Sequence, residues 1–270
     1  MASSTALLLT CLLVVLPPAW CHPLVEVARN DKPVSEVIEE ANKHLGEHPA
    51  GPQLVEGDIA VPAGLTNAAR CTSTSSWFSC KWPTYRDGLV YVPYVISPAY
   101  GYNELWLINK AMKSFEQTTC ILFIPRQHNQ RDFLYIMSDN GCYSSVGRQG
   151  GGQVVSLQRG ACVYLGTVQH ELLHALGFQH EQNRSDRDQH VKILWQNIVP
   201  GKEQNFQKAD TNNLGTPYSY GSVMHYGREF FSRNGKPTIV PIPDPNVEIG
   251  KATAMSELDI RRINLLYCRK

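Results

Sequence analysis

One eleven-residue stretch, from His170 to His180, restricts the fold of this chain more than any other feature. Apolar residues recur at helical spacing into and through it: Val163, Leu165, Val168, Leu172, Leu173 and Leu176. His170 and His174 stand one helical turn apart, which puts their side chains on one face with Cβ atoms about 6 Å apart. Gly177 predicts the end of this helix, because glycine adopts the left-handed conformation without a steric cost. The stretch therefore predicts a buried helix and a reversal that brings His180 back towards the first two histidines.

The three histidines in this arrangement favour one zinc ion. Neutral imidazoles are common zinc ligands, and His170, His174 and His180 would leave one coordination position open, which is typical of catalytic sites. Glu171 is not needed as a ligand and is predicted to act as general base on the metal-bound water. The alternative is a set of ordinary histidines near a helix. Gly177 and His180 argue against it, because they extend the short pattern HExxH.

Residues 1–21 predict a secretory signal. The apolar run 6–17 is too short to span a bilayer, and two prolines end it. Ala19 and Cys21 suit cleavage before His22. No other transmembrane candidate follows, so we expect a secreted protein without a membrane anchor.

The charge is unevenly distributed, although the formal net charge is only +1. Residues 22–66 hold 3 basic and 8 acidic side chains, a net of −5, whereas residues 67–270 carry +6. The acidic leader could dock on the basic body, and a solvated acidic segment is an equally open alternative. No nucleic-acid partner is expected.

Secretion makes disulfides expected. Six cysteines remain once the signal is removed: Cys71, Cys80, Cys120, Cys142, Cys162 and Cys268. Six cysteines allow 15 pairings, and the sequence pattern does not choose among them.

The rest of the chain predicts a mixed α and β protein. We expect a short helix from a cap at Ser35 to Gly46, an amphipathic helix over 103–119, and a last helix over 256–267 capped by Ser256 and Asp259. Strands are predicted at 90–96, 121–124, 133–136 and 153–157, with Pro93 favouring an edge or irregular position for the first. Strand 153–157 is expected to align an extended substrate by strand addition. After His180 the chain is rich in Asn, Gly and Pro, and regular structure should become sparse.

The zinc motif is followed by Glu181, and further on by residues 222–226 (Ser-Val-Met-His-Tyr). Together they resemble the astacin family of metzincin zinc endopeptidases, from about Glu56 to Cys268. The resemblance implies an α+β zincin fold. Such a fold has a twisted, mostly parallel N-terminal sheet with two long helices, an active-site cleft, and an irregular C-terminal subdomain ending in a helix. It also implies one zinc per chain, protein substrates and a monomer.

Within that family, Cys71 and Cys80 resemble the additional pair of a six-cysteine fish group. This group includes hatching enzymes, which digest the egg envelope, and the related nephrosins. Residues 154–157, 184–188 and 238–243 are most similar to high choriolytic (hatching) enzymes, which implies egg-envelope glycoproteins as substrates and release from secretory granules. A nephrosin-like protease of another tissue is the open alternative. A non-catalytic matrix-binding zincin is disfavoured because Glu171 and all ligands are present.

The resemblance also implies roles for single residues. Met224 resembles the Met-turn residue beneath the metal, and Tyr226 resembles the tyrosine that ligates zinc at rest and stabilises the transition state. Asp58 resembles the aspartate switch of a pro-segment. A cut after Thr66 would start the mature chain at Asn67, with the new terminus near Glu181.

The implied organisation is a signal (1–21), a pro-segment (22–66) and a protease domain (67–270). The implied disulfides are Cys71–Cys80, Cys120–Cys268 and Cys142–Cys162. Asn183 begins a glycosylation sequon three residues after the third histidine, where a sugar would crowd the cleft.

Overall fold

The computed structural model describes residues 32–45, 53–61 and 80–268, which belong to one compact unit covering 31–270. The predicted signal, Asn67 with the preceding cut, and Cys71 lie outside the described residues. None of the helices described there is long and apolar enough to cross a membrane.

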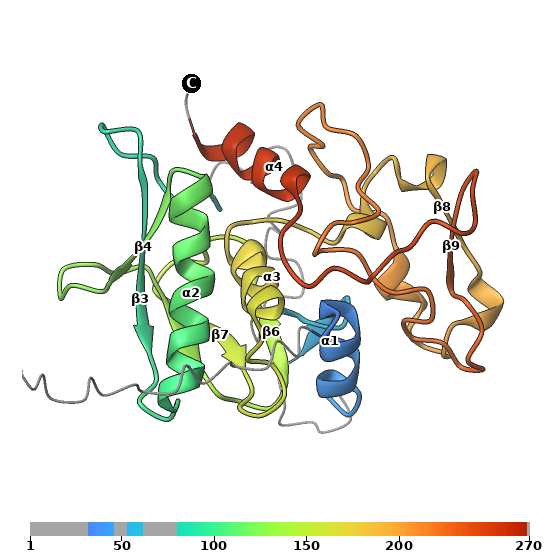
Figure 1. Cartoon of the computed structure of the whole chain (residues 1–270), viewed down its shortest axis with the longest axis horizontal. Coiled ribbons are helices and arrows are strands. Elements are labelled where there is room, and N and C mark those ends of the chain that lie inside the picture. The colour runs from blue at the N-terminus through green and yellow to red at the C-terminus, as the bar shows by residue number, and fades with distance from the viewer. Residues whose placement is uncertain (1–31, 46–52, 62–79, 269–270) are drawn as a thin grey trace, which may run out of the picture. The chain divides into compact units, whose positions relative to one another are not determined.

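A seven-stranded sheet forms the framework, in the order β1-β2-β6-β7-β5-β3-β4. Figure 1 labels four of its strands, β4, β3, β7 and β6. Four neighbouring strands are parallel: β3 (Val90–Ile96), β4 (Ile121–Pro125), β5 (Phe133–Met137) and β7 (Gly152–Leu157). They are the four strands that the apolar runs predict. Val90, Val92, Leu134 and Ile136 are fully buried, as expected for strands at the centre of a parallel sheet.

The sheet edge beyond β7 is built differently. Strand β6 (Cys142–Ser144) runs antiparallel to β7 and carries β2 (Ile59–Ala60) on its other side, with β1 (Leu54–Val55) outermost. The expectation that strand 153–157 receives a substrate strand is therefore wrong, because β7 lies between β6 and β5 and is bonded on both sides. The edge that an added strand could join belongs to β6, and residues 59–60 occupy it in the full chain.

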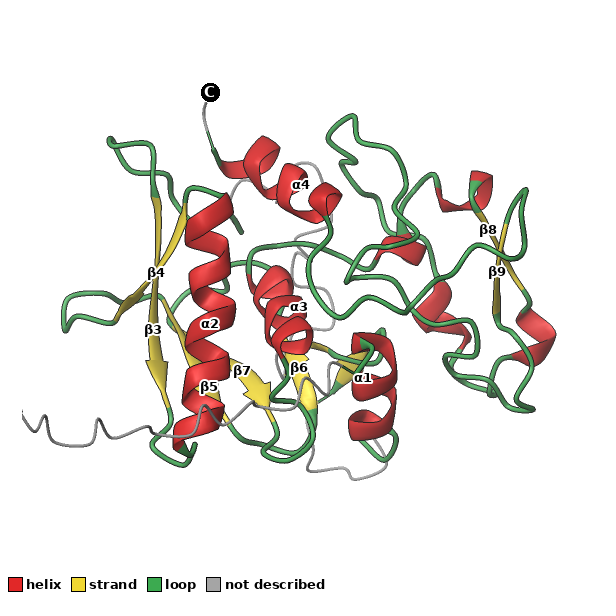
Figure 2. Cartoon of the chain, in the orientation of Figure 1, coloured by secondary structure: helices red, strands yellow, loops and turns green. Residues whose placement is uncertain are grey.

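Helices α2 (Tyr102–Thr118) and α3 (Leu165–Ala175) lie side by side against one face of the sheet (Figure 2). The predicted stripe of α2 faces inward, with Ile108, Met112 and Phe115 buried. Every residue of α3 from 166 to 175 is buried. Gly166 permits this, since a Cβ there would lie 2.3 Å from the carbonyl oxygen of Thr253. The helix that carries the histidines is thus held on all sides.

Pro93 does not mark an edge strand, because β3 lies between β5 and β4. The β3–β5 ladder begins with Tyr94 opposite Leu134, one residue after the proline. Pro93 lies before the first pair of this ladder, so its missing N–H removes no hydrogen bond between β3 and β5. The proline is therefore compatible with a central strand.

After His180 the described chain contains short 3₁₀ turns, a two-stranded sheet of β8 (Val191–Ile193) and β9 (Ile239–Pro241), and the final helix α4 (Glu257–Tyr267). The predicted cap of α4 is confirmed: Asp259 N–H donates to Ser256 Oγ at 3.2 Å, and Ser256 N–H donates to Asp259 Oδ2 at 2.9 Å. The fold is the mixed α+β architecture, with an irregular C-terminal part, that the resemblance implies.

Helix α1 (Val34–Asn42) corresponds to the predicted pro-segment helix, but Ser35 does not cap it. The helix begins two residues earlier than a cap at Ser35 predicts, after Pro33, and no side chain caps it. Ser35 Oγ instead accepts a hydrogen bond from the Gly227 N–H at 2.7 Å. A partner 192 residues away has replaced the local cap.

Two disulfides join described cysteines, Cys120–Cys268 and Cys142–Cys162. Both are pairs that the resemblance implies. Cys80 is also disulfide-bonded, and Cys71, its implied partner, lies outside the described residues.

Candidate metal centre

The end of α3 brings the three histidines together. Gly177 has φ +99°, and the Phe178 N–H donates to the Leu173 carbonyl at 3.0 Å, which closes the helix by a left-handed turn as predicted. The chain then returns His180 to the helix. The ring centroid of His174 lies 4.6 Å from that of His170 and 4.7 Å from that of His180.

The outer nitrogen of each imidazole has an acceptor. Nδ1 of His170 lies 2.9 Å from the Val223 carbonyl, and Nδ1 of His174 lies 2.8 Å from the Phe178 carbonyl. Nδ1 of His180 lies 3.0 Å from a carboxylate oxygen of Glu56. Each acceptor fixes a proton on Nδ1, which leaves the Nε2 lone pair available to a metal.

The inner nitrogens surround the carboxylate of Asp58. The distances to its oxygens are 2.9 Å from His170 Nε2, 3.6 Å from His174 Nε2 and 3.1 Å from His180 Nε2. The ligand atoms of these four buried residues lie within 4.8 Å of one another. Among the described residues, His174 Nε2 and Asp58 Oδ1 have no hydrogen-bond partner. Three imidazole nitrogens and one carboxylate oxygen are a donor set that zinc prefers, so these residues fit the ion.

The charges around the centre suit a bound cation. Burial alone would raise the pKa of Asp58, but the neighbouring histidines outweigh burial and hold this pKa well below its usual range. Burial lowers the pKa of His174 to about 4, which keeps that imidazole neutral. A buried carboxylate needs a compensating positive charge. Burial would lower the pKa of His180, but Asp58 and Glu56 raise it to about 9, so a proton on this imidazole balances Asp58 without an ion, and a divalent ion would take over that task when bound.

Glu171 lies beside the ligands in an unusual environment. Its side chain is fully buried, and neither carboxyl oxygen has a hydrogen-bond partner in the described chain. Burial raises the pKa of Glu171 well above its usual range, and Asp58 raises it further. A buried carboxyl without partners is costly for stability, which marks Glu171 as a functional rather than a structural group.

The segment that carries Met224 and Tyr226 lies against the histidines on another side. Met224 is 3% exposed and belongs to the core, as expected of an apolar floor. The ring of Tyr226 lies 4.8 Å from that of His180 and stacks on Phe230 at 3.9 Å. Burial raises the pKa of Tyr226 well above its usual range, so its hydroxyl stays protonated and is a donor. In the full chain this hydroxyl donates to the carbonyl of Glu56.

The turn that presents Asp58 depends on Gly57. Glu56 and Gly57 have φ of +52° and +81°, a left-handed region that glycine occupies without strain. A Cβ on Gly57 would also lie 3.3 Å from the rings of Phe230 and Phe231. Glu56 N–H donates to Asn205 Oδ1 at 2.8 Å. The Glu56 contacts to His180, Tyr226 and Asn205 were not predicted, and no local pattern in the sequence indicates them.

Glu181 is the centre of a buried ion cluster. Arg262 of α4 contacts both of its carboxylate oxygens, at 2.6 and 2.9 Å, and Arg184 approaches one at 3.4 Å. The Ser219 N–H donates to Glu181 as well, at 2.7 Å. The sequence does not predict that Arg262 pairs with Glu181. Its position on the buried face of the last helix is the one indication that this arginine has a buried partner.

Asn183, in the glycosylation sequon, is 0% exposed, and its Nδ2 donates to the Asn205 carbonyl at 3.0 Å. We expect the folded, secreted protein to carry no glycan at Asn183, because a sugar would break this contact and could not fit. Intact mass measured before and after glycosidase treatment checks this, with Ser185→Ala as the control. A mass shift that Ser185→Ala abolishes would contradict the expectation.

Three imidazoles whose inner nitrogens converge on one point, with the partnerless carboxyl of Glu171 on the helix that carries two of them, are the arrangement of a zinc-dependent endopeptidase. The sequence model of the Astacin peptidase family matches residues 79–268. The chain belongs to this family, whose members are zinc enzymes that act on protein substrates.

Individual relatives agree with this assignment. High choriolytic enzyme 1 from Oryzias latipes is 47% identical over 274 residues, which cover 100% of this chain and 99% of the relative. High choriolytic enzyme 2 of the same fish is 53% identical over 219 residues, covering 80% and 76% of the two chains. A solved structure of high choriolytic enzyme 1, described as a hatching enzyme zinc-protease, is 54% identical with a TM-score of 0.69. It covers 73% of this chain and 98% of its own.

Proposed function

We propose that this zinc endopeptidase is secreted as a zymogen and digests egg-envelope proteins after activation. Residues 1–21 serve as the signal, 22–66 as the pro-segment and 67–270 as the protease domain. The single observation that carries the latency is Asp58, whose carboxylate stands among all three histidine Nε2 atoms. His170, His174 and His180 would hold a zinc ion, and the Asp58 carboxylate would then exclude the water that the reaction needs.

The proposed mechanism assigns distinct tasks to Glu171 and Tyr226. Zinc, when bound, supplies a Lewis acid that polarises the peptide carbonyl and makes water more acidic. Glu171 accepts the proton of the attacking water and returns it to the departing amine, a task that suits a carboxyl whose pKa burial has raised. Tyr226, freed from the Glu56 carbonyl, donates a hydrogen bond to the oxygen on which negative charge develops.

Tyr226→Phe is expected to lower kcat about 10- to 1000-fold while changing KM much less, because the hydrogen bond forms mainly in the transition state. Steady-state kinetics of the cut enzyme on a quenched peptide check this. Phe230, which stacks on the ring, offers a matched control: Phe230→Leu removes packing and keeps the hydroxyl. A kcat within twofold of wild type would leave Tyr226 a purely structural role.

Substrate alignment is proposed at the outer edge of β6. In the full chain β2 pairs with this edge, and the Ser144 N–H donates to the Asp58 carbonyl at 3.0 Å. Removal of residues 22–66 would free the edge for the main chain of an extended peptide. The egg-envelope assignment rests on relatives named choriolytic enzymes that match most or all of the chain.

Activation is proposed to proceed by a cut after Thr66, which gives a mature amino terminus at Asn67 and places it near Glu181. Glu181 is already paired with Arg262 and Arg184 in the full chain. The new ammonium group would therefore join a carboxylate whose charge is compensated beforehand.

Isolated fish egg envelopes test the proposed function. Cut enzyme should solubilise envelope protein, whereas the uncut chain and cut Glu171→Ala should release none. Casein cleavage by the cut enzyme without envelope release would overturn the hatching role and favour a protease of another tissue. No cleavage of either substrate by folded, zinc-loaded enzyme would overturn the mechanism.

A further inference from the structure

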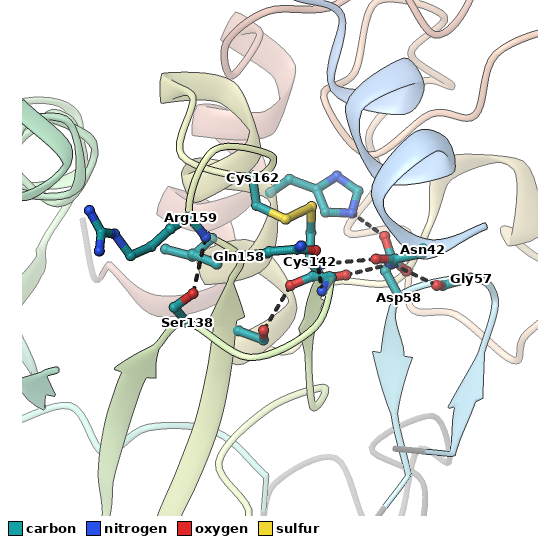
Figure 3. Close-up of a disulfide and its surroundings, with 12 residues drawn as sticks. Asn42, Gly57, Asp58, Ser138, Cys142, Gln158, Arg159 and Cys162 are labelled. Atoms are coloured by element: carbon teal, nitrogen blue, oxygen red, sulfur yellow. Dashed lines mark hydrogen bonds and ion pairs between the residues drawn. A yellow bond between two sulfur atoms is a disulfide. The ribbon is translucent and has the colours of Figure 1, made fainter. Parts of the chain in front are cut away.

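Asn42, the last residue of α1, makes the most specific contact between the pro-segment helix and the sheet (Figure 3). Its Nδ2 donates to the Cys142 carbonyl at 2.6 Å and to the Gly57 carbonyl at 2.9 Å. Its Oδ1 accepts from the Cys142 N–H at 2.8 Å. One carboxamide thus joins α1, the loop that presents Asp58, and strand β6.

The part of β6 that Asn42 meets is shaped for this contact. Gly141 has φ +86°, and a Cβ there would lie 2.3 Å from both Asn42 Oδ1 and a methyl of Leu45. The contact therefore needs glycine at position 141. Gly141 is held in turn, because its N–H donates to Gln158 Oε1 at 2.8 Å and its carbonyl accepts from Ser156 Oγ at 2.7 Å.

Bonding of both the N–H and the carbonyl of one residue is what a neighbouring strand does to its partner in a sheet. Strand β2 bonds to the Ser144 N–H but does not extend to Cys142. The Asn42 side chain bonds both groups of Cys142, where a peptide group of a longer added strand would otherwise lie. Together, β2 and Asn42 cover both outward-facing residues of β6.

We propose that the Asn42 carboxamide is a second lock on the enzyme, which closes the edge of β6 by contacts other than the one that Asp58 makes at the histidines. This inference rests on the proposed zymogen. The two contacts act on different groups: Asn42 holds the main chain of Cys142, whereas Asp58 stands among imidazole nitrogens. Both contacts stabilise the same closed position of residues 56–58, because Asn42 Nδ2 also donates to the Gly57 carbonyl, so loss of either one raises the fraction of open chain.

Other residues of α1 connect the helix to the C-terminal part of the chain. Val34 N–H donates to the Ala252 carbonyl at 2.9 Å, and Glu39 Oε1 accepts from the Phe231 N–H at 3.2 Å. Both partners lie in the C-terminal region, whereas Asn42 binds the sheet. Helix α1 is therefore fixed on both regions, and loosening Asn42 frees the end nearest the substrate edge.

The test compares uncut full chains, with processing excluded by mass. Initial rates on a quenched peptide are measured for wild type, Asn42→Ala, Asp58→Ala and the double variant, and amide exchange of residues 141–146 is followed. Three hydrogen bonds are lost in Asn42→Ala, so we expect an activity about 10- to 100-fold above uncut wild type. Exchange in β6 should also become faster, and the double variant should exceed Asp58→Ala. Lys43→Ala, at a neighbouring position on the same helix end, should match wild type.

A folded, uncut Asn42→Ala protein as silent as wild type would overturn the second lock, whatever its exchange. If Asp58→Ala leaks while Asn42→Ala does not, this inference fails and the zymogen stands. If uncut wild type is as active as cut enzyme, the zymogen itself fails. Asn42→Asp keeps the size and the acceptor but turns both donor bonds into repulsion, so it should leak as well. If Asn42→Ala does not fold, the result for Asn42→Asp decides the proposal.

Discussion

Cut enzyme carrying Glu171→Ala is expected to retain its zinc and to lose peptide hydrolysis by at least about 100- to 10,000-fold, the range for a general base. The carboxyl lies on the helix turn that carries His170 and His174, yet it bonds to none of the described residues. Its removal therefore takes away the proton acceptor and leaves the Val223 and Phe178 carbonyls, which orient His170 and His174, in place. Zinc content by elemental analysis and kcat on a quenched peptide measure the two effects separately.

Glu171→Gln is the matched control, because the amide keeps the shape and cannot accept the proton at neutral pH. Neither variant should unfold at a lower temperature than wild type, since a buried carboxyl without partners contributes no stabilising hydrogen bond. Retained hydrolysis in either variant would overturn the role of Glu171. Loss of zinc together with activity would show that Glu171 supports the ligands instead.

The metal centre could be predicted because its information is local. His170 and His174 share a helix face, and Gly177 ends the helix where only a left-handed residue closes it. Strong apolar periodicity likewise predicts α2 and the parallel strands. These features depend on residues a few positions apart, whose spacing is visible in the sequence.

The long-range contacts that surround the centre could not be predicted, because their two members come from distant parts of the chain. Asn42 and Cys142 are 100 residues apart, and Glu181 and Arg262 are 81 apart. A single Asn or Arg has no periodicity that would reveal such a pairing. Their roles arise only when tertiary packing removes water from both partners.

The incorrect expectations have the same cause. Ser35 has the sequence of a helix cap, but a distant N–H from Gly227 claims its hydroxyl. The composition of strand 153–157 fits an edge strand and a central strand equally well. It is central because β6 pairs with its outer side in the antiparallel direction. Pro93 argues against a central position locally, yet the ladder on that side begins after it.

The proposed latency of the full chain would be spread over several groups that the catalytic reaction uses. Asp58 faces the three imidazoles, and the Glu56 carbonyl holds the Tyr226 hydroxyl. The Asp58 carbonyl pairs with Ser144 on the substrate edge. Because residues 56–58 form one tight turn, a single segment would withhold the metal position, the proposed oxyanion donor and the strand edge together.

Uncut protein carrying Asp58→Ala is expected to hydrolyse a quenched peptide about 100- to 1000-fold faster than uncut wild type. Breaking a buried ionic contact costs about 3–5 kcal/mol. That energy shifts the equilibrium between the closed and the released pro-segment by about 100-fold or more. Asp58→Asn keeps the shape and one acceptor oxygen but removes the charge, so an intermediate activity is expected. Mass spectrometry at each time point excludes a cut before Asn67 as the source of activity.

The double variant Asp58→Ala/Glu171→Ala distinguishes activity of this chain from activity of a contaminating protease. It frees the metal position but has no proton acceptor. It should stay silent, which would assign the activity of Asp58→Ala to this chain's own site. If uncut Asp58→Ala is folded, loaded with zinc and still silent, the carboxylate is not what withholds the metal position. The Glu56 contacts to Tyr226 and His180, which alanine at position 58 leaves in place, would then suffice to keep the enzyme inactive.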